Sequence, residues 1–175
     1  MPVPIPTLTW AAGQTPAALR SLLATLGEEY PIREQGPGEK GTLPVAFILE
    51  PGRAGYECSQ GETGAVVRFG RARDAARAIG SLLSGLVGAG EPLREACPFT
   101  ELGMLLDCGH NAVVETHHLK KWLRRLALLG YDTVMIYTEA GYRLPGEPAF
   151  GYMHGAYPLE ELRDYVHAQE GKERE

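Results

Sequence analysis

The chain has 175 residues, of which 44% are hydrophobic, and carries a formal net charge of -5 at pH 7. This composition is typical of a globular protein with a core of its own, in one domain or in two small ones. A net negative charge gives no general attraction to nucleic acid or to an anionic membrane surface, so we expect neither as a partner.

The N-terminal residues 1–7 lack a basic start followed by an apolar core, and nowhere do about 18 apolar residues run together. We therefore expect a cytoplasmic chain with no membrane span. Three cysteines, Cys58, Cys97 and Cys108, are an odd number without a CxxC spacing. This pattern favours reduced thiols over a disulfide framework or a structural zinc site.

The first half of the chain predicts short strands and two amphipathic helices. Residues 8–10 are strand-like. A helix is expected over 16–27, with the Thr15 hydroxyl as its N-cap, leucines at three-and-four spacing on one face, and Gly27 ending it in a left-handed conformation. Residues 44–49 predict a buried strand.

Residues 56–58 and 65–69 then predict a hairpin with a loop longer than the tightest types. A second amphipathic helix is expected after Gly70, with its apolar positions between Ala75 and Leu86. We therefore predict a small α+β domain over residues 1–95, in which an antiparallel or mixed sheet carries two helices. Residues 88–98 are the expected junction to the second half of the chain.

From Phe99 the pattern changes to strands that alternate with helices. An apolar run at 102–107 precedes a helix at 116–130, and a second strand at 132–139 leads through a long loop to a helix that starts at Pro158. This order is typical of parallel βα units. The predicted fold class is therefore α/β, with two βα units over residues 99–175. We expect Leu119, Trp122, Leu123 and Leu126 to form one buried stripe.

Four segments of this second part closely resemble the opening of the catalytic barrel of family 20 glycoside hydrolases, the β-N-acetylhexosaminidases. They are residues 104–113 (MLLDCGHNAV), 126–132 (LALLGYD), 137–139 (YTE) and 146–153 (GEPAFGYM). Residues 1–95 resemble, by element order, the small non-catalytic domain before that barrel. The resemblance implies the first quarter of a TIM barrel, after which the polar residues 169–175 stand where a third strand should come.

The resemblance implies a retaining hydrolysis in which the substrate's own acetamido oxygen is the nucleophile, oriented by an aspartate and assisted by a neighbouring glutamate as general acid. In the family this pair lies after the fourth strand, and no part of the chain corresponds to it. We therefore assign no catalytic residue and no cofactor. The predicted function is a truncated β-N-acetylhexosaminidase-like fragment that is inactive alone. The alternative is a non-catalytic carbohydrate-binding or dimerising module derived from such an enzyme.

Reactive groups of a βα-barrel stand at the C-terminal ends of its strands. On this ground we predict that Asp107, His110, Glu139 and Tyr142 contact an N-acetylhexosamine-containing glycan. Structural roles stay open: Asp107 can cap the turn after its strand, and Tyr142 can pin the long loop. Four positions also differ from the family's more polar pattern, namely Leu102, His110, Ala140 and Ala156.

His117 and His118 lie about 100° apart on a helix, with no carboxylate or thiol at ligand spacing on the same face, so we expect no metal. A nucleophile pair of Cys108 and His110 is not expected either, because neighbouring loop residues seldom point at one another. Finally, Leu105 and Met135 would lie bare on the inner face of an unfinished barrel, beside an unpaired strand edge, which predicts a homodimer.

Overall fold

The structure of the chain is a computed structural model that describes residues 5–36, 40–109, 113–139, 141–151, 156–161 and 163. The chain divides into two compact units. The first unit comprises Met1–Thr100 with Leu126–Gly130, and the second unit comprises Glu101–Arg125 with Tyr131–Glu175. The predicted domain bounds at 1–95 and 99–175 stay a prediction. Among the described residues, no helix combines the length and the apolar sequence that a membrane span needs.

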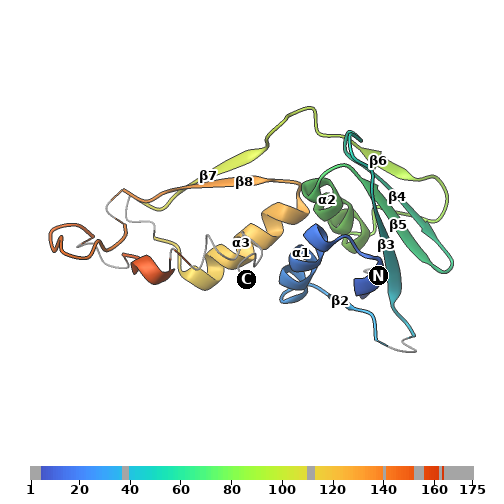
Figure 1. Ribbon diagram of the computed structural model, residues 1–175, viewed down its shortest axis with the longest axis horizontal. Coiled ribbons are helices and arrows are strands. Elements are labelled where there is room, and N and C mark those ends of the chain that lie inside the picture. Colours follow the sequence, from blue (N-terminus) through green and yellow to red (C-terminus); the bar gives the residue numbers. More distant parts are fainter. Residues whose placement is uncertain are drawn as a thin grey trace. The chain divides into compact units, whose positions relative to one another are not determined.

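The first unit is built on a six-stranded mixed sheet with the strand order β2-β1-β3-β5-β4-β6 (Figure 1). Strand β1 pairs in parallel with β2 and β3, and β3 pairs in parallel with β5. Strand β4 pairs antiparallel with β5 and β6. The strands are β1 (Leu8–Trp10), β2 (Ile32–Glu34), β3 (Leu43–Leu49), β4 (Tyr56–Gly61), β5 (Gly64–Phe69) and β6 (Leu93–Glu95). This confirms the predicted mixed sheet.

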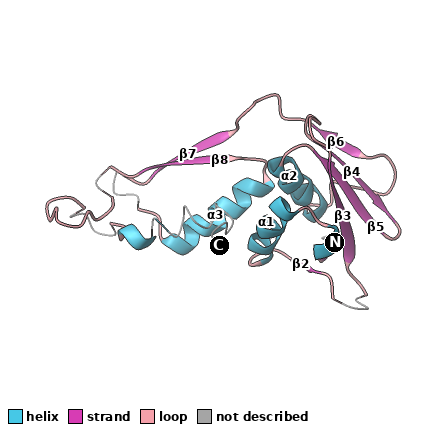
Figure 2. Cartoon of the chain, viewed as in Figure 1, coloured by secondary structure: helices cyan, strands magenta, loops and turns pink. Residues whose placement is uncertain are grey.

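Two helices, α1 (Ala17–Gly27) and α2 (Ala72–Leu83), lie on the same face of this sheet (Figure 2). Strand β5 alternates as a sheet with one covered face must, since Ala65, Val67 and Phe69 are buried while the residues between them are not. The leucines of α1 and the apolar positions of α2 close the core on that face. Within it the hydroxyls of Tyr56 and Ser81 lie 2.8 Å apart, so neither polar group is buried without a partner.

Local details of the first helix differ from the prediction. The short 3-10 helix η1 (Ala12–Gln14) precedes α1, and the Thr15 hydroxyl donates to the Ala11 carbonyl at 2.8 Å instead of capping α1. Gly27 is the last residue of α1, and its backbone is not left-handed. A Cβ there would lie 2.4 Å from the Ile32 carbonyl oxygen, so a close approach of two backbones, not a turn, requires this glycine.

The hairpin is also tighter than predicted. Gly61 pairs with Gly64, which leaves only Glu62 and Thr63 in the turn. The three-residue strands β2 and β6 were not predicted. Strand β6 falls within the expected junction at 88–98, where Arg77 of α2 holds it through two bonds of 2.9 and 3.1 Å to Glu95.

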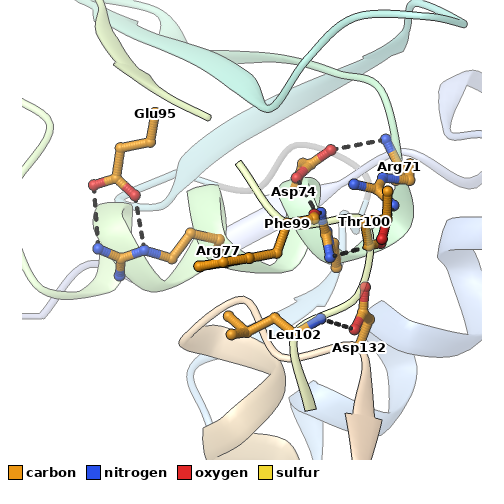
Figure 3. A network of polar contacts seen from close by, with 9 residues as sticks. Arg71, Asp74, Arg77, Glu95, Phe99, Thr100, Leu102 and Asp132 are labelled. Carbon is orange, nitrogen blue, oxygen red and sulfur yellow. Dashed lines mark hydrogen bonds and ion pairs between the residues drawn. The ribbon is translucent and has the colours of Figure 1, made fainter. Parts of the chain in front are cut away.

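The segment after β6 is held by a buried arginine at the start of α2. Arg73 is 6% exposed and donates to the carbonyl oxygens of Phe99 at 2.7 Å and Thr100 at 3.3 Å. Its neighbour Asp74 accepts from the backbone N–H of Arg71 at 3.1 Å (Figure 3). A charged donor therefore replaces water at two main-chain carbonyls and fixes the path of the chain at 99–100.

The second unit contains strands β7 (Gly103–Asp107) and β8 (Thr133–Tyr137), which pair in parallel, and helix α3 (Thr116–Leu128) between them. This is the predicted βαβ unit. The backbone N–H of Leu102 donates to the Asp132 carboxylate at 2.8 Å, and the Asp132 N–H donates to the Leu102 carbonyl, so the two strands begin together (Figure 3).

The last turn of α3 belongs to the first unit. Leu128 is buried in that unit's core, and a Cβ on Gly80 of α2 would lie 2.3 Å from its carbonyl oxygen. On the α3 stripe Leu119 and Leu126 are buried as predicted, but Trp122 is 46% exposed. Trp122 is rotated about 60° from Leu119 around the helix axis, which places it at the border of the stripe and not at its centre.

Candidate functional site

The parallel pairing of β7 and β8 brings the predicted residues of both strands to one edge. Asp107 is in register with Tyr137, and the Cys108 N–H donates to the Tyr137 carbonyl at 2.8 Å, which continues the ladder beyond the strands. Both strands therefore end together, as the C-terminal edge of a βα-barrel requires. His110 lies outside the described residues, as does Ala140.

Asp107 and the turn after it form a compact structure. The Gly109 N–H donates to Asp107 Oδ1 at 2.9 Å, which is the capping contact expected if this aspartate has a structural role. A Cβ on Gly109 would lie 3.1 Å from the Tyr137 ring and 3.2 Å from Cγ of Glu139. Glu139 therefore packs directly over this turn, and the glycine is required by that close approach.

Glu139 has a left-handed backbone, with φ of 42°, which few non-glycine residues adopt and which is enriched at functional sites. Its Oε1 accepts a hydrogen bond from the Tyr137 hydroxyl at 2.9 Å. That bond to Glu139 raises the pKa of Tyr137, as do partial burial and the charges of Glu139 and Asp107. The edge thus holds two exposed carboxylates and one phenol, a set that accepts hydrogen bonds from a ligand's hydroxyl groups.

Tyr142 has a structural role in the loop after β8. Its ring packs edge-on against Phe150, with ring centroids 5.0 Å apart, and its backbone bridges to Tyr157. Tyr157 is buried and its hydroxyl donates to the Val114 carbonyl. These contacts support the loop-pinning interpretation for Tyr142, while its predicted contact with sugar stays a prediction. Tyr152 lies outside the described residues.

One premise of the metal prediction was wrong. Glu115 lies directly before α3, and its carboxylate reaches Nδ1 of His117 at 3.3 Å. Ligand atoms of Glu115, His117 and His118 all lie within 4.8 Å of one another. The helical spacing argument failed because Glu115 is outside the helix and does not follow its 100° periodicity.

The face of the β7–β8 pair that carries Leu105 and Met135 is bare in the second unit, as predicted. Their exposed fractions are 62% and 64%, and Tyr137 beside them is 43% exposed. Within the described residues β7 and β8 pair only with each other, so each strand keeps one free edge. All three cysteines are unpaired, and burial raises the pKa of Cys58 to about 12.

No family model matches the chain, and no curated protein matches it. Solved structures do. An exo-β-N-acetylglucosaminidase of glycoside hydrolase family 20 from Vibrio harveyi, in complex with N-acetylglucosamine, aligns with a TM-score of 0.67 at 17% identity. The alignment covers 93% of this chain and 30% of that one.

Two Streptomyces structures give the same result. A mutant β-hexosaminidase from Streptomyces plicatus in complex with its product GlcNAc aligns with a TM-score of 0.63 at 14% identity, and a family 20 β-N-acetylhexosaminidase from Streptomyces coelicolor A3(2) with 0.58 at 13%. Each alignment covers 96% of this chain and 40% of the other. The chain therefore has the fold of part of a family 20 hexosaminidase and spans less than half of its length. This confirms the predicted resemblance at the level of fold.

Proposed function

We propose that this chain is a β-N-acetylhexosaminidase-like part of a glycoside hydrolase, which contributes sugar-binding groups but does not hydrolyse glycans by itself. The observation that carries the proposal is the shared edge of β7 and β8, where Asp107 stands in register with Tyr137 and Glu139 packs over Gly109. The fold shared with family 20 structures supports the same assignment.

The ligand that we propose is an N-acetylhexosamine-containing glycan, contacted by Asp107, His110, Glu139 and Tyr142. Exposed carboxylates accept hydrogen bonds from sugar hydroxyls, and the Tyr137 hydroxyl, which already donates to Glu139, keeps that carboxylate in place. The unpaired thiols support a reducing compartment, so we also propose a cytoplasmic location.

Ligand-observed NMR with N-acetylglucosamine tests this role. We expect the chain to bind the sugar weakly and Glu139→Gln to weaken binding by roughly 10-fold or more, since a hydrogen bond to a charged group contributes about 1.5–3 kcal/mol. Glu62→Gln, an exposed carboxylate in the β4–β5 turn, is the matched control and should bind as the unaltered chain does. Equal binding by both variants would contradict a role for this edge.

Hydrolysis of a chromogenic N-acetylglucosaminide tests the second half of the proposal. We expect no turnover, because no part of the chain resembles the family's catalytic pair of neighbouring carboxylates. Hydrolysis that the Glu139→Gln variant also catalyses would show that the chain has catalytic groups outside the β7–β8 edge.

A second candidate function is a non-catalytic module that dimerises through the bare face of β7 and β8, which the exposure of Leu105 and Met135 favours. Sedimentation velocity distinguishes the two. A dimer should dissociate in the Met135→Lys variant but not in Leu49→Lys, which places a lysine at a comparably exposed leucine of the first unit. A monomer at micromolar concentration would rule this candidate out.

A further inference from the structure

The start of α3 gathers three side chains whose chemistry the proposed function does not use. Glu115, His117 and His118 are exposed, and one ligand atom from each lies within 4.8 Å of the other two. The imidazole rings of the two histidines face one another with centroids 4.0 Å apart and a tilt of 38°. Two imidazoles and a carboxylate are thus collected on one small patch of the second unit.

The local backbone explains why these groups meet. The Glu115 carbonyl accepts the N–H groups of His118 at 2.9 Å and Leu119 at 3.0 Å, which makes Glu115 the residue on which the helix starts. Its side chain can therefore fold back over the first turn. The Thr116 hydroxyl donates to Glu161 at 2.6 Å and holds this turn to a later segment of the same unit.

One of the three ligand-to-ligand distances fits a divalent cation, and the others are no longer than 4.8 Å. Two ligands that each lie about 2.0–2.1 Å from a tetrahedral ion are separated by about 3.3 Å. The distance from Nδ1 of His117 to the nearer Glu115 oxygen is 3.3 Å. A donor set of two imidazoles and one carboxylate suits first-row divalent ions such as Zn²⁺, and three protein ligands leave a coordination position for water.

We propose that Glu115, His117 and His118 form an open surface site for a first-row divalent cation, with Zn²⁺ as the probe of choice. The site uses none of the four residues that we propose as sugar contacts. Two features oppose the cation: the positive end of the α3 dipole, and Lys121 one turn beyond His117. We therefore expect a dissociation constant on the order of 10 µM, weaker than that of a closed four-ligand zinc site.

Isothermal titration of the full chain with Zn²⁺ tests the site. We expect one ion per chain, with binding weakened at least 10-fold in His117→Ala and in His118→Ala. Lys121→Gln should strengthen binding severalfold, because it removes a like charge without touching a ligand. The carboxylate control Glu62→Gln should leave binding unchanged. All these positions are exposed, and far-ultraviolet circular dichroism verifies that each variant folds.

Cobalt absorption identifies the ligands. Co²⁺ held by two imidazoles and a carboxylate gives weak visible bands and no thiolate charge-transfer band, and the visible bands should disappear in His118→Ala. A thiolate band would place the ion at a cysteine and overturn the proposal. The proposal also fails if Zn²⁺ does not bind at millimolar concentration, or if both histidine variants bind it as tightly as the unaltered chain.

Discussion

Replacing Arg73 by methionine should destabilise the first unit by about 3 kcal/mol. Methionine keeps most of the apolar stem but removes the hydrogen bonds from Arg73 to the carbonyl oxygens of Phe99 and Thr100, of which Thr100 keeps its bond from the Arg71 guanidinium at 2.7 Å. It also removes the cation 3.7 Å from the Asp74 carboxylate, in a place where the arginine is only 6% exposed. Breaking a buried charged pair costs about 3–5 kcal/mol. The lower end applies because Asp74 keeps its bond to the Arg71 N–H.

Urea unfolding followed by tryptophan fluorescence measures this effect. Trp10 is buried in the first unit and Trp122 is exposed, so a Trp122→Phe background leaves a signal from the first unit alone. For an m-value of about 2 kcal/mol/M, the midpoint should fall by about 1.5 M. Arg94→Met, which removes an exposed ion pair with Glu57, should cost less than about 1 kcal/mol. A midpoint for Arg73→Met within the range of that control would refute the reasoning.

Three further predictions concern the first unit. Gly80→Ala should lower the free energy of unfolding by about 1–2 kcal/mol in urea titrations, because its Cβ would lie 2.3 Å from the Leu128 carbonyl oxygen, which outweighs the gain of about 1 kcal/mol in helix propensity. Gly88→Ala, which meets no atom within 4 Å, should not be destabilising. Alkylation mapped by mass spectrometry at pH 8 should label Cys58 only as fast as the unit unfolds, since burial removes access and raises the thiol pKa to about 12; rapid labelling of folded protein would contradict this. Burial raises the pKa of the Tyr56 hydroxyl from 10.0 to about 12 and that of the Cys58 thiol from 9.0 to about 12. Because the unfolded chain loses these protons at lower pH than the folded chain, the free energy of unfolding should fall between pH 9 and 12. This fall should be less steep in Tyr56→Phe.

Hydrophobic periodicity predicts the elements of this fold that bury a continuous face. The leucines of α1, the apolar positions of α2 and the run in β3 each extend over enough residues for a pattern to repeat. Strands β2 and β6 have three residues each and no such repeat. These two strands form because a neighbouring strand offers hydrogen-bonding groups to them. Their own residues therefore do not predict them.

The candidate site was partly predictable because the two strands that carry it have a recognisable apolar pattern. Asp107 and Glu139 come after two predicted parallel strands, and their common edge results from the topology. The packing of Glu139 over Gly109 and its left-handed backbone depend on the turn geometry, which the sequence does not specify. The carboxylate of Glu115 was missed because a helical wheel does not apply to a residue that precedes the helix.

The place of Leu128 affects how the chain can be divided. This side chain completes the core beside α2, although the residues that lead to it belong to the other unit. A recombinant protein that ends at the predicted boundary near residue 98 would therefore lack Leu128 and would have an apolar cavity next to Gly80. A shortened version should carry a grafted copy of residues 126–130, or a larger side chain on α2, to remain folded.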